Sequence, residues 1–173
     1  MKKIASFILA VTMLVVCAAS AFATEVNWDK FQEEAAETVA KGDFVSFDEI
    51  SVKMWVPTVL TAVELSEEEQ EEGYIAYFMT EDESAAISVM YVDVDGMELE
   101  EYKAELEEVG ATDIEDVVVN GLPAVTYTLE EDDTACIAFT TEAGYILEVA
   151  AAPVSDEGFA ASITMVMASI QEA

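Results

Sequence analysis

The stretch DVVVNGLPAVTY, residues 116–127, decides the fold. Its two halves are rich in β-branched and aromatic residues, and Asn120-Gly121 joins them. An Asn-Gly pair between two such runs is typical of a tight β-hairpin, because both residues tolerate the positive φ angles that the turn requires. The sequence therefore predicts strands over 116–119 and 123–129. A third predicted strand, over 135–141, continues the same antiparallel meander.

Outward from this meander, the same patterns predict further strands. They cover residues 44–47, 51–57, 74–80, 84–94 and 145–151. In the 84–94 run, apolar side chains occupy both odd and even positions. This is typical of a central strand that is covered on both faces.

Three helices are predicted among these strands. They cover residues 28–41, with Asn27 as the N-cap, residues 98–109, and residues 156–171, with Ser155 as the N-cap. The expected buried stripe of the second helix is Leu99, Tyr102, Leu106 and Val109. Hairpins that cluster between helices predict an α+β fold, in which a mainly antiparallel sheet is flanked by helices.

The first 23 residues have the pattern of an export signal. Lys2-Lys3 is followed by an apolar run and then by Ala21-Phe22-Ala23, a small-x-small cleavage site. Two alternatives remain open: an uncleaved membrane anchor, since residues 4–23 are long enough to span a bilayer, and lipidation at Cys17. We therefore expect a secreted or cell-envelope protein that does not contact the membrane once the signal is removed.

The chain is strongly acidic and lacks the residues on which many sites depend. It has no His and no Arg, and in the part after residue 23 four Lys face 37 Asp and Glu, a net charge of −33. This composition excludes histidine acid–base chemistry, guanidinium binding of phosphate, and nucleic-acid binding. Cys136 lies in an apolar run and is expected to be an inert buried thiol. We therefore predict that the protein is not an enzyme.

The order of these elements resembles the PsbP-like superfamily, which includes the photosystem II extrinsic protein and a Ran-binding relative. A strand pair, a sheet hairpin, an acidic helix, the NGLPAVTY meander (residues 120–127) and a C-terminal helix ending in Ala168-Ser169-Ile170 carry the resemblance. It implies an α/β/α sandwich over about residues 43–171 and a role in docking onto protein partners. The expected organisation is a signal at 1–23, an N-terminal helix at 24–42 and a single domain at 43–173.

Two sets of residues are candidate sites. Trp55, beside Lys53 and opposite the Val52-Met54-Val56 face, is a candidate exposed anchor for a partner. Asp93, Asp95 and Glu98 follow a strand and are candidate ligands of a weakly bound calcium ion, although their spacing does not fit an EF-hand loop. No other cofactor is expected.

Two further acidic features have simpler interpretations. The run at 64–72, with Ser66 as a helix cap, is either a docking patch for a basic partner or a solvated turn. Glu148 lies in an apolar strand and is expected at the margin of the sheet.

The sequence therefore favours a secreted, non-enzymatic docking protein whose partner is an unidentified protein or cell-envelope component. The alternatives are a weak calcium-binding protein and, least favoured, a hydrolase that uses carboxylates alone.

Overall fold

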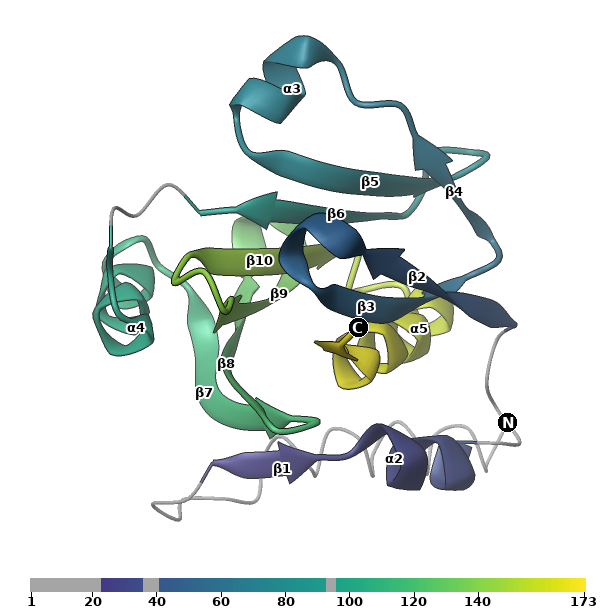
Figure 1. The fold of residues 1–173 in the computed structure, drawn as a ribbon. Coiled ribbons are helices and arrows are strands. Elements are labelled where there is room, and N and C mark those ends of the chain that lie inside the picture. Colours follow the sequence, from purple (N-terminus) through teal and green to yellow (C-terminus); the bar gives the residue numbers. More distant parts are fainter. Residues whose placement is uncertain (1–22, 36–40, 93–95) are drawn as a thin grey trace.

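The computed structural model describes residues 23–35, 41–92 and 96–173 and shows a large mixed sheet with a small sheet beside it (Figure 1). The eight strands of the large sheet run in the order β1-β7-β8-β9-β10-β6-β5-β4, and the small sheet has the order β11-β3-β2. The strands of the large sheet are β1 (Thr24–Val26), β4 (Leu60–Val63), β5 (Tyr74–Thr80), β6 (Ala86–Tyr91), β7 (Thr112–Val119), β8 (Leu122–Leu129), β9 (Thr134–Thr140) and β10 (Ile146–Ala152). Those of the small sheet are β2 (Gly42–Phe47), β3 (Val52–Pro57) and β11 (Gln171–Glu172).

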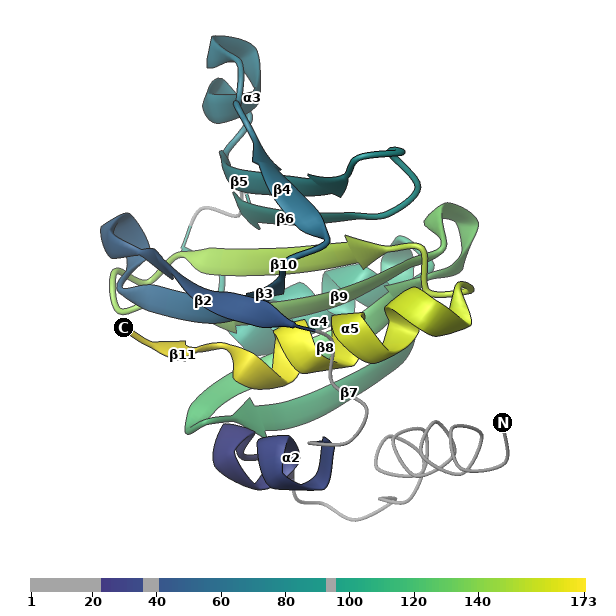
Figure 2. The ribbon, with the colours of Figure 1, turned by 90° about the vertical axis from the view of Figure 1, so that its right-hand side faces the viewer.

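Helices cover the two faces of the large sheet unequally. The helices are α2 (Trp28–Ala35), α3 (Glu67–Glu71), α4 (Leu99–Glu108) and α5 (Glu157–Ser169), with short 3-10 turns at Asp48–Ile50 and Glu130–Asp132. Helix α5 and the small sheet lie on one face, and α4 lies on the other (Figure 2). The larger apolar cluster fills the α5 side, around Ile87, Phe139 and Val166. A smaller cluster around Leu106 and Ile146 lies under α4.

The Asn-Gly hairpin fastens the N- and C-terminal segments to the sheet. Asn120 and Gly121 both have positive φ, as the predicted turn requires. The Asn120 side chain accepts a hydrogen bond from Trp28 N (2.7 Å) and donates to the carbonyl oxygens of Ala168 (2.9 Å) and Ile170 (2.8 Å). One turn residue therefore connects the start of α2 and the end of α5 to the hairpin between β7 and β8.

Most predicted elements are confirmed, and the α+β class is correct. Asn27 caps α2, with Lys30 N donating to its side chain, and Ser66 forms a capping box with Glu69 at α3. Three short partners of longer strands were missed: β4, β1, which pairs in parallel with β7, and β11, which pairs with β3 and begins at Gln171, the residue at which the last helix was predicted to end. Such edge segments carry too few residues for a periodic pattern to show.

Several details of the prediction were wrong. Helix α2 is described only to Ala35, and Lys41 is not helical. Helix α5 is capped by Asp156, whose side chain accepts from Phe159 N, and not by Ser155. Val109, placed in the buried stripe of α4, is 72% exposed because it lies at the C-cap, beyond the last turn that contacts the sheet. Strand β6 is buried on one face only.

Candidate functional site

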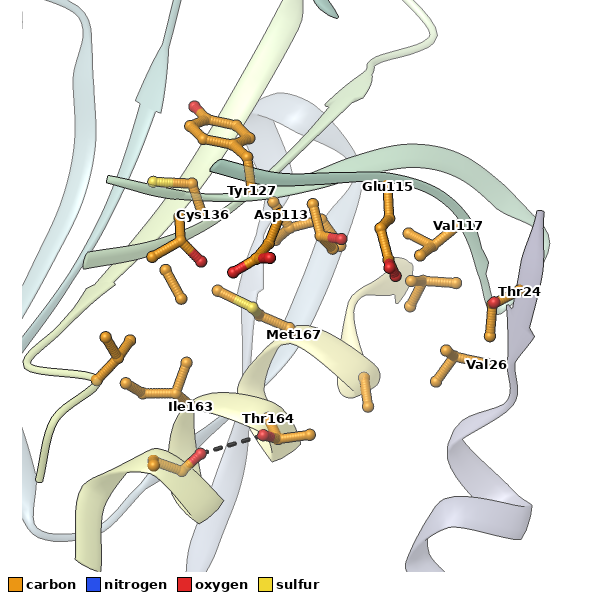
Figure 3. A pocket seen from close by; sticks show the side chains of 18 of the residues that line it. Thr24, Val26, Asp113, Glu115, Val117, Tyr127, Cys136, Ile163, Thr164 and Met167 are labelled. Carbon is orange, nitrogen blue, oxygen red and sulfur yellow. Dashed lines mark hydrogen bonds between the residues drawn. The ribbon is translucent and has the colours of Figure 1, made fainter. Parts of the chain in front are cut away.

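A pocket of about 410 Å³ opens between α5 and the β7–β9 end of the large sheet (Figure 3). Strand β1 and Phe31 of α2 close one side of it. Val26, Val117, Ile137, Ile163 and Met167 give the pocket a mainly apolar lining. A concave, preformed space with an apolar lining and few polar groups is the usual form of a binding site.

The pattern of each element decides which side chains reach the pocket. Along β7, alternation directs Glu115, Val117 and Val119 to the α5 side. On α5, Ala160, Thr164 and Met167 recur at helical spacing, remain half-buried and line the opposite wall. The Tyr127 ring points away, to the other side of the sheet, so only the α5 face of these strands forms the pocket (Figure 3).

A β-bulge adds a second carboxylate to the pocket. The β7–β8 register shifts between Thr112 and Glu115, so β7 carries one more residue than β8 there. Asp113 lies in this bulge with φ 52°, an uncommon conformation for a residue other than Gly. Asp113 and Glu115 both extend from β7 into the cavity (Figure 3).

The environment of these two carboxylates favours a positively charged ligand. Partial burial, and then the neighbouring charge of Asp113, raises the pKa of Glu115 above its usual value. Within the described residues, neither carboxylate has a hydrogen-bonding donor or a cationic partner. Asp113 is exposed, so a cation placed between the two carboxylates would offset the lost hydration of Glu115 and the repulsion between the two charges. The pocket is therefore suited to an apolar group that bears a positive charge.

A second group of polar side chains lies on the opposite face of the same strands, beneath α4. Tyr102 Oη lies 3.0 Å from Tyr127 Oη, and both hydroxyl groups donate to Glu148 Oε2, Tyr102 over 3.1 Å. Burial raises the pKa of both phenols and of the Cys136 thiol beside them. Because this cluster is enclosed by α4 and its hydroxyl groups are satisfied, we interpret it as the polar part of the α4 interface.

The structure places Glu148 differently from the prediction. It lies on β10, between β9 and β6, and so in the interior of the sheet and not at its margin. The predicted alternation along the strand is correct, since Ile146 and Ala150 share its face and Leu147 and Val149 belong to the α5 side. Cys136 is buried, as expected.

Trp55 is not an exposed anchor. It is 5% exposed, packs against Trp28 with a ring-centroid distance of 6.4 Å, and lies so close to Gly42 that a Cβ there would meet its ring at 2.2 Å. On the face opposite Val52-Met54-Val56, Trp55 is buried because Trp28 of α2 packs against it, which strand alternation alone does not reveal. Lys53 is half-buried at the centre of the small sheet, where it is paired with Ser46 and Gln171.

The proposed calcium ligands are only partly visible. Asp93 and Asp95 lie outside the described residues, and Glu98 caps α4 together with Glu101. Among the residues that the structure describes, no group of three or more Asp, Glu, Cys or His side chains is arranged to hold a metal ion. The calcium site therefore stays a prediction.

The pocket itself was missed from the sequence. The prediction began the strand at residue 116 and left Asp113 and Glu115 outside it. The alternation of Asp113, Ile114 and Glu115 was the available signal, because Ile114 packs under α4 while its neighbours face α5. The opposite wall of the pocket belongs to α5, which lies about 50 residues later in the chain. A local sequence pattern cannot predict that these two segments pack against each other.

Comparison with known proteins yields a likeness of fold. No protein-family model matches the chain, and no curated protein matches its sequence. No helix in the described part of the chain is long and apolar enough to cross a membrane. The solution structure of cyanobacterial PsbP (CyanoP) from Synechocystis sp. PCC 6803 superposes with a TM-score of 0.56 at 12% identity, covering 78% of this chain and 94% of that one. The chain therefore has a PsbP-like fold, as its element order predicts.

Proposed function

We propose that this protein is an exported, non-enzymatic binding protein that docks onto a protein or cell-envelope partner through the pocket between α5 and β7–β9. The observation that carries the proposal is an open apolar pocket with two carboxylates, Asp113 and Glu115, that no donor within the described residues neutralises. The occupant is an apolar group with a positive charge, such as a lysine side chain presented among apolar residues of the partner.

The arrangement of the two carboxylates favours binding over hydrolysis. A pair that cleaves a glycosidic bond must flank that bond, one carboxyl on each side. Asp113 and Glu115 instead extend from one strand toward α5, and they share one wall of the pocket (Figure 3). Groups arranged in this way can hold a cation but do not enclose a bond.

A small probe tests the chemistry of the pocket. n-Hexylamine, as the ammonium ion, resembles a lysine side chain with an apolar stem, and n-hexanol is its neutral counterpart. Titration of the purified protein, followed by amide chemical shifts, is expected to perturb residues 113–117 and 160–168. Hexylamine should bind several-fold more tightly than hexanol, since two partly solvated ionic contacts contribute roughly 0.2–1 kcal/mol each. Equal affinities would contradict the role of the carboxylates.

A matched pair of variants separates the pocket from the overall charge. Asp113→Asn/Glu115→Gln should abolish the preference for hexylamine. Glu100→Gln/Glu107→Gln removes the same charge from the exposed side of helix α4 and should leave that preference unchanged. An equal loss in both variants would mean that only the net charge attracts the probe.

Photocrosslinking in the native cell tests the docking role. A photoreactive amino acid at position 164, on the pocket wall of α5, should give a discrete adduct with one partner. The same group at Val109, which is 72% exposed on the other face, is the control and should not give it. Identical adducts from both positions, or an adduct that Asp113→Asn/Glu115→Gln leaves unchanged, would rule out docking through the pocket.

A further inference from the structure

The outer edge of β5 is open over its first half. Strand β4 is the last strand of the large sheet on this side, and it pairs only with Tyr77–Thr80. In the described part of the chain, no strand pairs with Tyr74–Ala76 on that side. A strand edge without a partner presents backbone N–H and C=O groups to which another strand can bind.

A groove of about 630 Å³ runs along this open edge. After Val63, the last residue of β4, the chain turns away from β5 and forms α3. It rejoins the sheet after Gly73, so that α3 projects from the sheet (Figure 1). The groove lies between this excursion and β5, and Val63, Leu65, Gln70, Tyr74, Ile75 and Tyr77 are among its lining residues. The groove is therefore bounded by β5 on one side and by side chains of the segment that carries α3 on the other.

The segment that bounds the groove, residues 64–72, is acidic and is held together by internal hydrogen bonds. Ser66 and Glu69 form a reciprocal capping box, and Gln70 Nε2 donates to Leu65 O over 3.1 Å. Glu64 lines the groove itself, and the other acidic side chains on and beside α3 are exposed next to it: Glu67, Glu68, Glu71 and Glu72. No lysine occurs between Lys53 and Lys103 to neutralise them.

We propose that the open edge of β5 binds an extended segment of a partner protein, which adds a strand to the large sheet and carries lysine or arginine opposite α3. Main-chain hydrogen bonds give such complexes their register, and side-chain pockets and charge give them specificity. A second copy of this chain is disfavoured as the occupant, because it would bring another net charge of −31 and another acidic α3 to the same edge.

Three peptides test this proposal on the purified protein. The first is acetyl-Lys-Val-Lys-Val-Lys-amide, the second is the same peptide with the backbone nitrogen of every lysine and valine methylated, and the third has Glu in place of Lys. Amide chemical shifts should change at residues 62–65 and 74–77 with the first peptide. The N-methylated peptide, which keeps its charge but lacks strand N–H groups, should bind at least about tenfold more weakly, and the Glu peptide should not bind.

Two triple variants with the same net charge test which carboxylates recognise the lysine residues of the peptide. Glu68→Gln/Glu71→Gln/Glu72→Gln on and beside α3 should weaken binding of the first peptide about tenfold, the sum of three exposed ionic contacts. Glu100→Gln/Glu105→Gln/Glu107→Gln, on the exposed side of α4, should change it less than about twofold.

Distinct results would overturn the proposal. Equal binding of the N-methylated peptide excludes strand addition, and an equal loss in both triple variants excludes recognition by α3. Shift changes confined to residues 113–117 and 160–168 would assign the peptide to the α5 pocket instead. A dimer seen by sedimentation equilibrium, dissociated by the peptide, would make a second copy the occupant. Because the two sites share no residue, failure here leaves the pocket proposal to its own test.

Discussion

Strands β7, β8 and β9 present two contrasting faces. On the α4 side, the hydroxyl groups of Tyr102 and Tyr127 are packed together and both donate to Glu148. On the α5 side the same strands form an apolar pocket that is open, with Asp113 and Glu115 lacking any donor among the described residues. The enclosed face thus satisfies its polar groups internally, whereas the open face leaves charge available.

This difference separates the α4 face, which contributes to stability, from the α5 face, which is available for binding. A buried polar group without a partner costs about 1–3 kcal/mol, so an enclosed interface must pair its hydroxyl and carboxyl groups. At a half-open surface, water reduces that cost and unpaired carboxylates are tolerated.

Apolar truncations should differ most between the faces. Leu106→Ala, on the buried side of α4 at 4% exposure, should lower the free energy of unfolding by about 2–5 kcal/mol, because it leaves a cavity in the apolar cluster between α4 and the sheet. Met167→Ala, on the half-open pocket wall, should cost only about 1 kcal/mol, since the residue is partly solvated already. Denaturant unfolding of both variants measures the two losses in free energy of unfolding. Equal losses would mean that the α5 face is as enclosed as the α4 face.

The tyrosine pair should behave as one unit. Tyr127→Phe removes a donor to the half-buried Glu148 and should cost about 1–3 kcal/mol in the free energy of unfolding. Tyr102→Phe, made in the Tyr127→Phe background, should cost measurably more than it does alone, because Glu148 then loses its remaining phenol donor. The exposed Tyr145→Phe serves as the control and should change stability by less than about 0.5 kcal/mol. Strictly additive losses would show that the three side chains do not form a network.

The ion pair at the rim of the α4 face should contribute little. Lys103 Nζ lies 2.6 Å from Asp116 Oδ2, but the two side chains are 24% and 48% exposed. Lys103→Met should therefore cost no more than about 1 kcal/mol, and the difference from the unmodified protein should shrink as NaCl is raised. A larger, salt-independent loss in chemical denaturation would place this contact with the enclosed interface.

The smallest effect concerns the pH dependence of the pocket. Burial and the charge of Asp113 raise the pKa of Glu115 in the folded chain, so the folded state binds more protons than the unfolded one. Stability should then fall as the pH rises from the unfolded carboxyl pKa, about 4.3, through the raised folded value, and remain lower above it. Glu115→Gln, which cannot ionise, should gain in melting temperature relative to the unmodified protein between about pH 4 and pH 7.

Glu105→Gln, on the exposed side of α4, is the control for this measurement. A gain of equal size in that variant would attribute the effect to net charge. A relative loss on raising the pH would contradict the direction of the Glu115 shift.

Local patterns predicted the backbone well and the sites poorly. The Asn120-Gly121 turn, the α3 cap and the strands of the meander depend on neighbouring residues, and these were correct. Trp55 was misplaced because its solvent exposure depends on α2, which packs over it from elsewhere in the chain. The pocket was missed for the same reason, since its two walls are separated by roughly 50 residues.

The α+β class, the antiparallel meander and the acidic character of the molecule follow from local sequence, because turn chemistry, hydrophobic periodicity and charge are properties of short segments. Three other features are fixed by folding alone: which carboxylates stay unpaired beside an apolar pocket, which tyrosines contact Glu148, and where the sheet edge stays open. Those outcomes depend on contacts between distant segments, and the free energy of such contacts is set by burial that no single segment encodes.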